Sequence, residues 1–102
     1  MTKQVFQVLL SLADTPRHGY AIIQDVAQRT NDEVRLTAST LYDALARLVD
    51  QGLIAEAKSP PDNPDPRRRY YTLTKSGRSA AQDEARRLAR TVAVAKARRL
   101  IG

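Results

Sequence analysis

Apolar side chains recur at helical spacing near the middle of the chain. Leu41, Leu45 and Leu48 lie four and three residues apart, so they fall on one face of a helix. Thr37 can cap the start of that helix with its hydroxyl oxygen, and Gly52 can adopt the left-handed conformation that often ends one. The pattern predicts an amphipathic helix whose opposite face begins with short polar side chains.

The segment after this helix predicts a β-hairpin. Residues 53–57 and 70–73 have the length of short strands, and the second run is rich in aromatic and β-branched side chains. Between them lie four of the chain's five prolines and three consecutive arginines, Arg67, Arg68 and Arg69. A helix followed by such a hairpin is the layout of a winged helix-turn-helix, whose helix enters the major groove and whose hairpin tip reaches phosphates.

Two further helices are expected before this unit, over residues 3–13 and 17–30. Each has apolar residues at helical spacing, and Pro16 separates them because the residue before a proline is disfavoured in a helix. The second of these helices and the one that begins at Thr37 form the helix-turn-helix. The connector 34–36 could add an edge strand to the hairpin.

Candidate catalytic and metal-binding residues are scarce. The chain has no cysteine and one histidine, His18, whereas metal ligands come in sets of three or four. Paired carboxylates or a glycine-rich loop in a catalytic setting are also lacking. We therefore expect no metal, no cofactor and no enzymatic activity, and a structural hydrogen bond for His18.

Residues 75–101 predict one long helix that begins after Thr74, a candidate N-cap. A seam with the spacing of a heptad repeat runs along it: Ala81, Ala85, Leu88, Val92, Ala95 and Arg99. Asp83 and Arg87 are spaced for an ion pair. We expect the seam to pair with a second subunit; the alternative is a helix folded back on its own domain.

The formal charge is +6, from 17 basic and 11 acidic residues, which favours nucleic acid as a partner and an anionic membrane surface next. The apolar face of residues 78–99 is mostly alanine and would anchor poorly in a membrane. No stretch approaches the roughly 18 apolar residues of a membrane span, and the N-terminus lacks the pattern of a signal peptide. We therefore expect a cytoplasmic protein without membrane contact.

Several short motifs together resemble the PadR family of transcriptional regulators. They are His18-Gly19-Tyr20, Thr40-Leu41-Tyr42, Gly52-Leu53-Ile54, Arg69-Tyr70-Tyr71, Leu73-Thr74 and Gly77, within residues 5–79. The resemblance implies a mainly α fold with a small β-hairpin, namely a winged helix-turn-helix over residues 1–74 and a C-terminal dimerisation helix over 75–102. It also implies a homodimeric repressor on a two-fold symmetric operator, with relief by a small aromatic or drug-like ligand.

Two sets of candidate residues follow from the patterns and the resemblance. Contacts to double-stranded DNA are expected from Tyr20, Thr37, Ser39, Thr40, Tyr42, Arg47, Arg67, Arg68 and Arg69. Contacts between subunits are expected from Phe6, Leu9, Ala81, Ala85, Leu88, Val92 and Ala95. The alternative for the two tyrosines is packing in the core.

The chain departs from the family pattern at several points. Ser39 stands where many members have glycine, Asp43 occupies a position that is often basic, and the proline-rich hairpin tip lacks glycine. The chain has no tryptophan, whereas ligand-binding members use an aromatic slab between subunits; Phe6 is the comparable residue here. The alternative function is a winged-helix module that binds another protein without DNA readout, for which three consecutive arginines are poorly suited.

Overall fold

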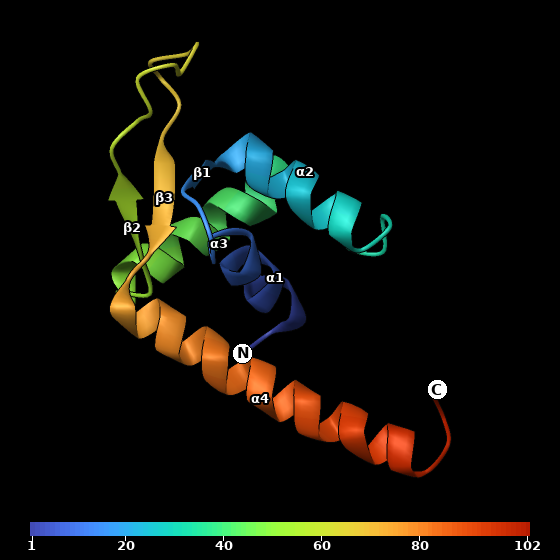
Figure 1. Ribbon diagram of the computed structural model, residues 1–102. Coiled ribbons are helices and arrows are strands. Elements are labelled where there is room, and N and C mark those ends of the chain that lie inside the picture. The colour runs from blue at the N-terminus through green and yellow to red at the C-terminus, as the bar shows by residue number, and fades with distance from the viewer.

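The computed structural model describes all 102 residues. Four helices and three short strands follow one another along the chain: α1 (Lys3–Ser11), β1 (Arg17–His18), α2 (Gly19–Arg29), α3 (Ala38–Asp50), β2 (Ile54–Ala57), β3 (Tyr70–Leu73) and α4 (Lys75–Ala97). Figure 1 shows α1, α2 and α3 grouped beside the β2–β3 hairpin, with α4 crossing below them. The predicted mainly helical winged helix-turn-helix is confirmed.

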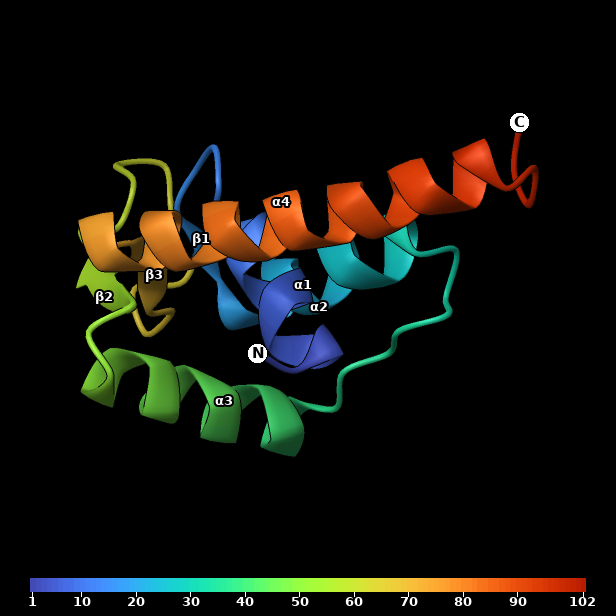
Figure 2. The same ribbon diagram turned by 90° about the horizontal axis from the view of Figure 1, so that it is seen from below.

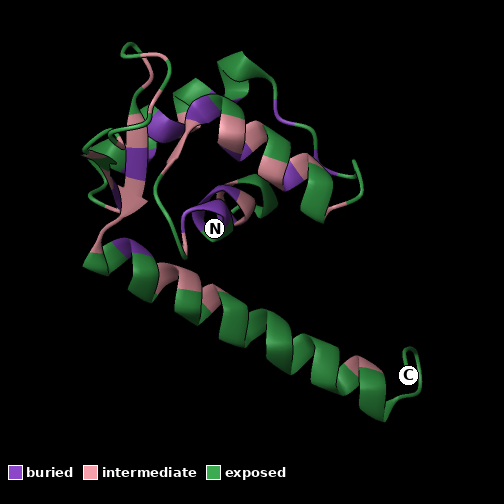
Figure 3. Ribbon diagram, turned by 45° about the horizontal axis from the view of Figure 1, so that its top comes forward, coloured by how far each residue is buried: buried purple, intermediate pink, exposed green.

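The core lies where α1, α2 and α3 meet beside the sheet. Its 12 buried side chains, mostly Leu, Ile and Val, come from these three helices, the α2–α3 connector and the sheet. Leu41, Leu45 and Leu48 are at most 2% exposed, so the predicted apolar face of α3 packs inward. Burial of each such side chain contributes about 1.5–3 kcal/mol. Figure 3 shows the buried residues gathered in this unit, whereas most of α4 is exposed.

The helices begin and end at the residues that can cap them. The Oγ1 atom of Thr37 accepts a hydrogen bond from the backbone N–H of Thr40 at 3.1 Å. At the start of α2, Nδ1 of His18 accepts one from the N–H of Ala21 at 3.2 Å. Gly52 follows α3 with a φ of 74°. The predicted start and end of α3 and the structural hydrogen bond of His18 are therefore confirmed.

The third strand lies in a different segment from the one expected. β1 pairs antiparallel with β3, with His18 opposite Tyr70, and the sheet order is β1-β3-β2. The predicted helix over 17–30 therefore begins two residues later, and the edge strand suggested for 34–36 is wrong. Val34 and Leu36 are instead buried in the core, at 8% and 6% exposed, and hold the α2–α3 connector against the helices.

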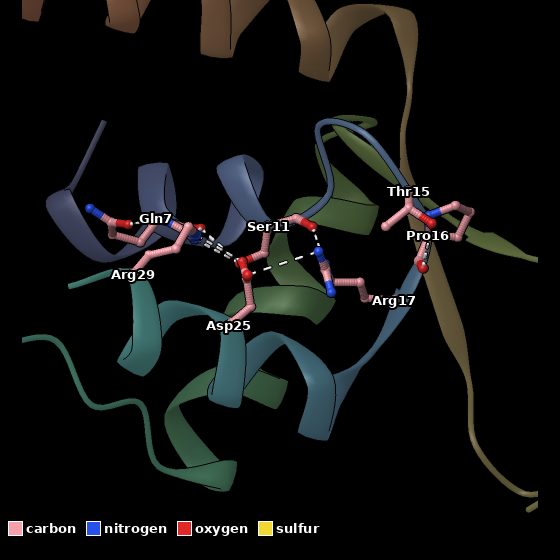
Figure 4. A network of polar contacts seen from close by, with 7 residues as sticks. All are labelled: Gln7, Ser11, Thr15, Pro16, Arg17, Asp25 and Arg29. Atoms are coloured by element: carbon pink, nitrogen blue, oxygen red, sulfur yellow. Dashed lines mark hydrogen bonds and ion pairs between the residues drawn. The ribbon is translucent and has the colours of Figure 1, made fainter. Parts of the chain in front are cut away.

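A polar network joins α1 to α2 (Figure 4). The carboxylate of Asp25 accepts hydrogen bonds from the hydroxyl of Ser11 and from Nε of Arg29, both at 2.8 Å. Arg29 also donates to the side-chain oxygen of Gln7 at 2.8 Å, and Nε of Arg17 donates to the carbonyl of Ser11 at 2.7 Å. Because Ser11 is only 1% exposed, its polar atoms depend on these partners.

Hydrogen bonds tie the start of α4 to the end of α3. The hydroxyl of Thr74 donates to the carbonyl of Gly52 at 2.6 Å and accepts from the N–H of Gly77 at 3.0 Å. The N–H of Thr74 donates to the carbonyl of Leu53 at 3.1 Å. A Cβ atom on Gly77 would lie 1.8 Å from that same carbonyl oxygen, so only glycine allows the first turn of α4 this close. We call these four residues the α3–α4 junction.

The first half of α4 packs on the other elements of the chain and the second half projects past them. Arg78 donates to the carbonyl of Ala13 at 2.7 Å, and Ala81 packs against the core. Figure 2 shows the C-terminal end of α4 beyond the other helices. The helix ends at Ala97, and the chain then turns at Arg99, which has a φ of 64°. The assignment of Arg99 to the helical seam is therefore wrong.

The ion pairs on α4 also differ from the expected one. Asp83 pairs with Arg86 at 3.1 Å, and Arg87 donates two hydrogen bonds to Glu84, at 2.7 and 2.8 Å. The predicted pair of Asp83 with Arg87 does not form because the two-pronged contact with Glu84 occupies the guanidinium group. No helix of the structure is long and apolar enough to span a membrane.

We expect Asp25→Asn to lower the free energy of unfolding by about 1–3 kcal/mol at pH 7, because charged hydrogen bonds are lost. Burial raises the pKa of Asp25, but hydrogen bonds from Arg29 and Ser11 and the charges of Arg29 and Arg17 outweigh it, so the pKa is lowered overall. Its stabilising contribution is therefore present above the unfolded pKa, about 3.9, and is lost as the pH falls through the folded value. Urea unfolding at several pH values should show the two proteins converging in acid.

The matched control for this test is Asp50→Asn, which removes an exposed carboxylate without an ion pair and should leave stability nearly unchanged. A difference between the Asp25 variant and the native protein that did not shrink as the pH was lowered would contradict the role of the ionised carboxylate.

Gly77→Ala should destabilise the protein, although the same exchange at an ordinary helical position stabilises by up to about 1 kcal/mol. The added methyl group overlaps the carbonyl of Leu53, so the start of α4 must move and about 1–3 kcal/mol is lost. Ser76→Ala, at an exposed neighbouring position, is the control. Thermal unfolding of the three proteins measures the effect. A higher melting temperature for Gly77→Ala than for the native protein would show that Gly77 does not lie tightly against the carbonyl of Leu53.

Candidate nucleic-acid interface

The polar face of α3 is open to solvent. Since Leu41, Leu45 and Leu48 face the core, helix geometry places four exposed residues on the opposite side: Ser39, Asp43, Ala46 and Asp50. Thr40 and Arg47 border this row on the side of α1, where they line a hollow with Val5. Tyr42 borders it on the side of the hairpin. The first turn, with Thr37, Ser39 and Thr40 all exposed, is the end of α3 that a groove can reach.

The tip of the hairpin, residues 58–69, carries the arginines and is called the wing here. Arg67 donates to Oδ1 of Asp65 from its backbone N–H at 3.0 Å and from Nε at 3.3 Å. Arg69 pairs with Glu56 at 3.4 Å. The side chains of Arg67 and Arg69 remain 91% and 75% exposed. Such exposed ion pairs are weak, so both guanidinium groups can exchange their partners for a stronger anion.

A hollow of about 450 Å³ lies between the wing and the N-terminus of α2. It brings together five residues predicted to contact DNA: Tyr20, Tyr42, Arg67, Arg68 and Arg69. The tyrosines are 58% and 54% exposed, so the alternative that they pack in the core is wrong. Residues far apart in the sequence thus form one cationic and aromatic surface next to the exposed face of α3.

Sequence reasoning missed four residues that line this hollow. They are His18 and Gly19 at the start of α2, Asp65 on the wing and Tyr71 on β3. A Cβ atom on Gly19 would lie 2.8 Å from the hydroxyl of Tyr42, so the missing side chain makes room for the tyrosine ring. The hydroxyl of Tyr42 consequently lies at the positive end of the α2 dipole. A glycine directly after a capping residue is a sequence signal for such a close approach.

The charged groups leave the hollow positive at neutral pH. Burial, followed by the nearby charge of Arg68, lowers the pKa of His18, so the ring is neutral and can accept the hydrogen bond that caps α2. Hydrogen bonds from the backbone and side chain of Arg67 lower the pKa of Asp65, which therefore stays ionised. Three guanidinium groups then face one carboxylate, an arrangement suited to an anionic ligand.

Arg47 lies away from this hollow. It lines two smaller hollows between α1 and α3, of about 330 and 320 Å³, together with Val5 and Ala44. Its side chain is exposed and makes no ion pair with Asp43, four residues before it. The predicted DNA-contact residues therefore fall into three sets: five at the hollow, Thr37, Ser39 and Thr40 at the start of α3, and Arg47 further along that helix.

The residues expected between subunits divide between the core and the open surface. Leu9 is 0% exposed inside its own subunit and leaves no area for a partner, so its assignment to a subunit interface is corrected. Ala81 packs against the same core, and Phe6 is 8% exposed. Further along α4, Leu88 and Val92 are 38% and 44% exposed. Ala85 is also exposed and Ala95 is half-buried.

Comparison with known proteins identifies a family that this chain matches over most of its length. Residues 8–83 match the model of the transcriptional regulator PadR-like family. An uncharacterised 37.1 kDa protein in transposon Tn4556 of Streptomyces fradiae is 40% identical over 83 residues, which are 81% of this chain. The match covers 22% of that relative, so the chain spans less than a quarter of its length.

Two solved structures have a similar fold. A PadR family transcription regulator from Clostridium difficile superposes with a TM-score of 0.74 and 25% identity, over 90% of this chain and 93% of that one. Bacillus subtilis PadR in complex with operator DNA gives a TM-score of 0.71 and 24% identity, over 83% of this chain and 48% of that one.

Proposed function

The chain belongs to the PadR-like family of transcriptional regulators, and we propose that it acts by binding duplex DNA as a homodimer. The observation that carries the proposal is the hollow in which Tyr20, Tyr42 and three wing arginines meet beside the exposed first turns of α3. Membership of this family agrees with the prediction that the chain is not an enzyme.

The proposed contacts divide by chemistry. The first turns of α3, with Thr37, Ser39 and Thr40, enter the major groove, where short polar side chains allow a close approach to base edges. The hydroxyl groups of Tyr42 and Tyr20 donate hydrogen bonds to phosphates beside that groove. Arg47 contacts the phosphates on the side of α1.

The wing arginines bind flanking phosphates. Arg67 and Arg69 form exposed ion pairs that cost little to break, and Arg68 lines the same hollow. Phosphate offers each guanidinium a stronger two-pronged contact. These contacts carry no base information, so they supply affinity and orientation. A winged-helix module that binds another protein remains the second candidate, but a run of guanidinium groups beside an open hollow favours a polyanion.

The proposed dimer forms through α4. Leu88 and Val92 share one face of α4 and are 38% and 44% exposed in the single chain, and the half of the helix that carries them projects past the rest of the chain. Exposed apolar residues on one face of a projecting helix favour a partner there. Ala85 and Ala95 allow two such helices to approach closely, and a two-fold axis between them would place the two α3 helices on a two-fold symmetric operator.

Repression is the regulatory outcome we propose, because a dimer that occupies an operator excludes other proteins from it. We assign no effector, since Phe6 is almost fully buried and the exposed part of α4 carries no aromatic side chain. DNA binding of this kind would place the protein in the cytoplasm.

Replacing Arg67, Arg68 and Arg69 with alanine should weaken binding to every duplex and reduce the slope of log affinity against log salt by about one per arginine. Mobility-shift titrations at several salt concentrations measure both quantities. The triple lysine variant keeps the charge and should retain the slope while losing two-pronged phosphate contacts. Altered base preference with an unchanged slope would mean that the wing reads bases.

Leu88→Asp should dissociate the dimer and leave the subunit folded, because the residue contributes nothing to the core of its own chain. Burying a carboxylate twice at a two-fold interface is strongly unfavourable. Sedimentation should report a monomer, circular dichroism an intact fold, and DNA affinity should fall. Ala93→Asp, at an exposed position on another face of α4, is the control. A Leu88→Asp protein that stayed dimeric would move the interface away from this helix.

A further inference from the structure

The exposed face of α3 carries two carboxylates, Asp43 and Asp50, which are unexpected on a helix that approaches phosphates. Both lie opposite the buried leucines, and no ion pair of the structure includes either of them. Asp50 is the last residue of α3, at the end remote from the proposed groove contact. Asp43 lies one turn after Ser39, within the part of the helix that would enter the groove.

Asp43 contributes little to the fold. It lies beyond the first turn of α3, where a carboxylate would interact favourably with the helix dipole, and aspartate is a weak helix former. Its nearest potential partner on the helix, Arg47, forms no ion pair with it. The carboxylate therefore has no hydrogen-bond donor of its own protein and points to solvent in the row that faces away from the core.

We propose that Asp43 selects a cytosine by accepting a hydrogen bond from its 4-amino group in the major groove. The inference rests on the proposed function, since it requires that α3 enters this groove. A carboxylate accepts hydrogen bonds only, so phosphate oxygens, guanine N7 and O6, and thymine O4 all repel it. Only the amino groups of cytosine and adenine can satisfy it there.

Cytosine is the better of these two partners. Adenine presents the N7 acceptor next to its amino group, and this nitrogen repels the second carboxylate oxygen. Cytosine has a C–H group next to its amino group instead of a ring nitrogen, so it does not repel the second carboxylate oxygen. Asp43 thus penalises three of the four bases at one position of each half-site, while the arginines of the wing supply attraction that is indifferent to sequence.

The test is selection of duplex DNA from a random library by four proteins: the native chain, Asp43→Asn, Asp43→Ala and Asp50→Asn. The native protein should require cytosine at one position of each half-site, with a preference on the order of tenfold. Asp43→Asn should shift that position to adenine, because an amide donates to N7 and accepts from the 6-amino group. Asp43→Ala should lose the preference there and bind unrelated duplexes more tightly than the native protein.

Asp50→Asn removes the same charge from the same face and should keep the cytosine, which separates base contact from the change in net charge. The inference is overturned if Asp43→Asn and the native chain select the same bases at every position, or if the position that changes was not cytosine. If the native chain selects no sequence and does not retard duplex DNA, the proposed function itself fails. Circular dichroism verifies the fold of each variant.

Discussion

The α3–α4 junction determines how the two functional parts of the molecule are related. Thr74 donates to the carbonyl of Gly52, in the turn that follows α3, and caps α4 with the same hydroxyl group. Gly77 allows the first turn of α4 to lie against Leu53, between that turn and β2. These contacts hold the start of α4 close to the end of α3. The direction in which α4 leaves the domain is consequently fixed relative to the helix that we propose reads DNA.

Charge is distributed so that attraction and selection come from different surfaces. The wing and the hollow carry the guanidinium groups, two tyrosine hydroxyls and the N-terminus of α2, all of which suit phosphate. The row of α3 residues opposite the buried leucines contains two carboxylates, Asp43 and Asp50, and no positive side chain, although Arg47 borders it. In the function that we propose, the positive part holds any duplex and the negative part excludes duplexes that do not offer an amino group. The proposed separation would account for a carboxylate on the α3 face of a basic protein.

The sequence predicted those helix ends and helix faces that depend only on residues close together along the chain. Thr37 and Thr74 cap helices, Gly52 ends one, and the leucines of α3 face the core, since each of these depends only on spacing along the chain. The pairing of His18 with Tyr70 could not be predicted in this way. A strand of two residues has no periodicity, and its partner lies some fifty residues away.

The sequence predicted which residues belong to the candidate site, but not how they are arranged in space. Tyr20, Tyr42 and the arginines were identified, yet their meeting in one hollow depends on the register of the sheet and on the absence of a side chain at Gly19. The sequence pattern also could not predict that Leu9 is buried in the core. Apolar residues at helical spacing can face either the core or a second subunit.

The dimer that we propose depends on α4 holding two α3 helices at the spacing of successive major grooves. The chain has no cysteine, so Ser39→Cys provides a single site for a spin label at the exposed start of α3. Pulsed dipolar spectroscopy of the free protein then measures the separation of the two labels. We expect a narrow distribution of label separations near ~34 Å, one helical turn of DNA. Absence of a dipolar signal, or a distribution far from one turn, would contradict the proposed dimer.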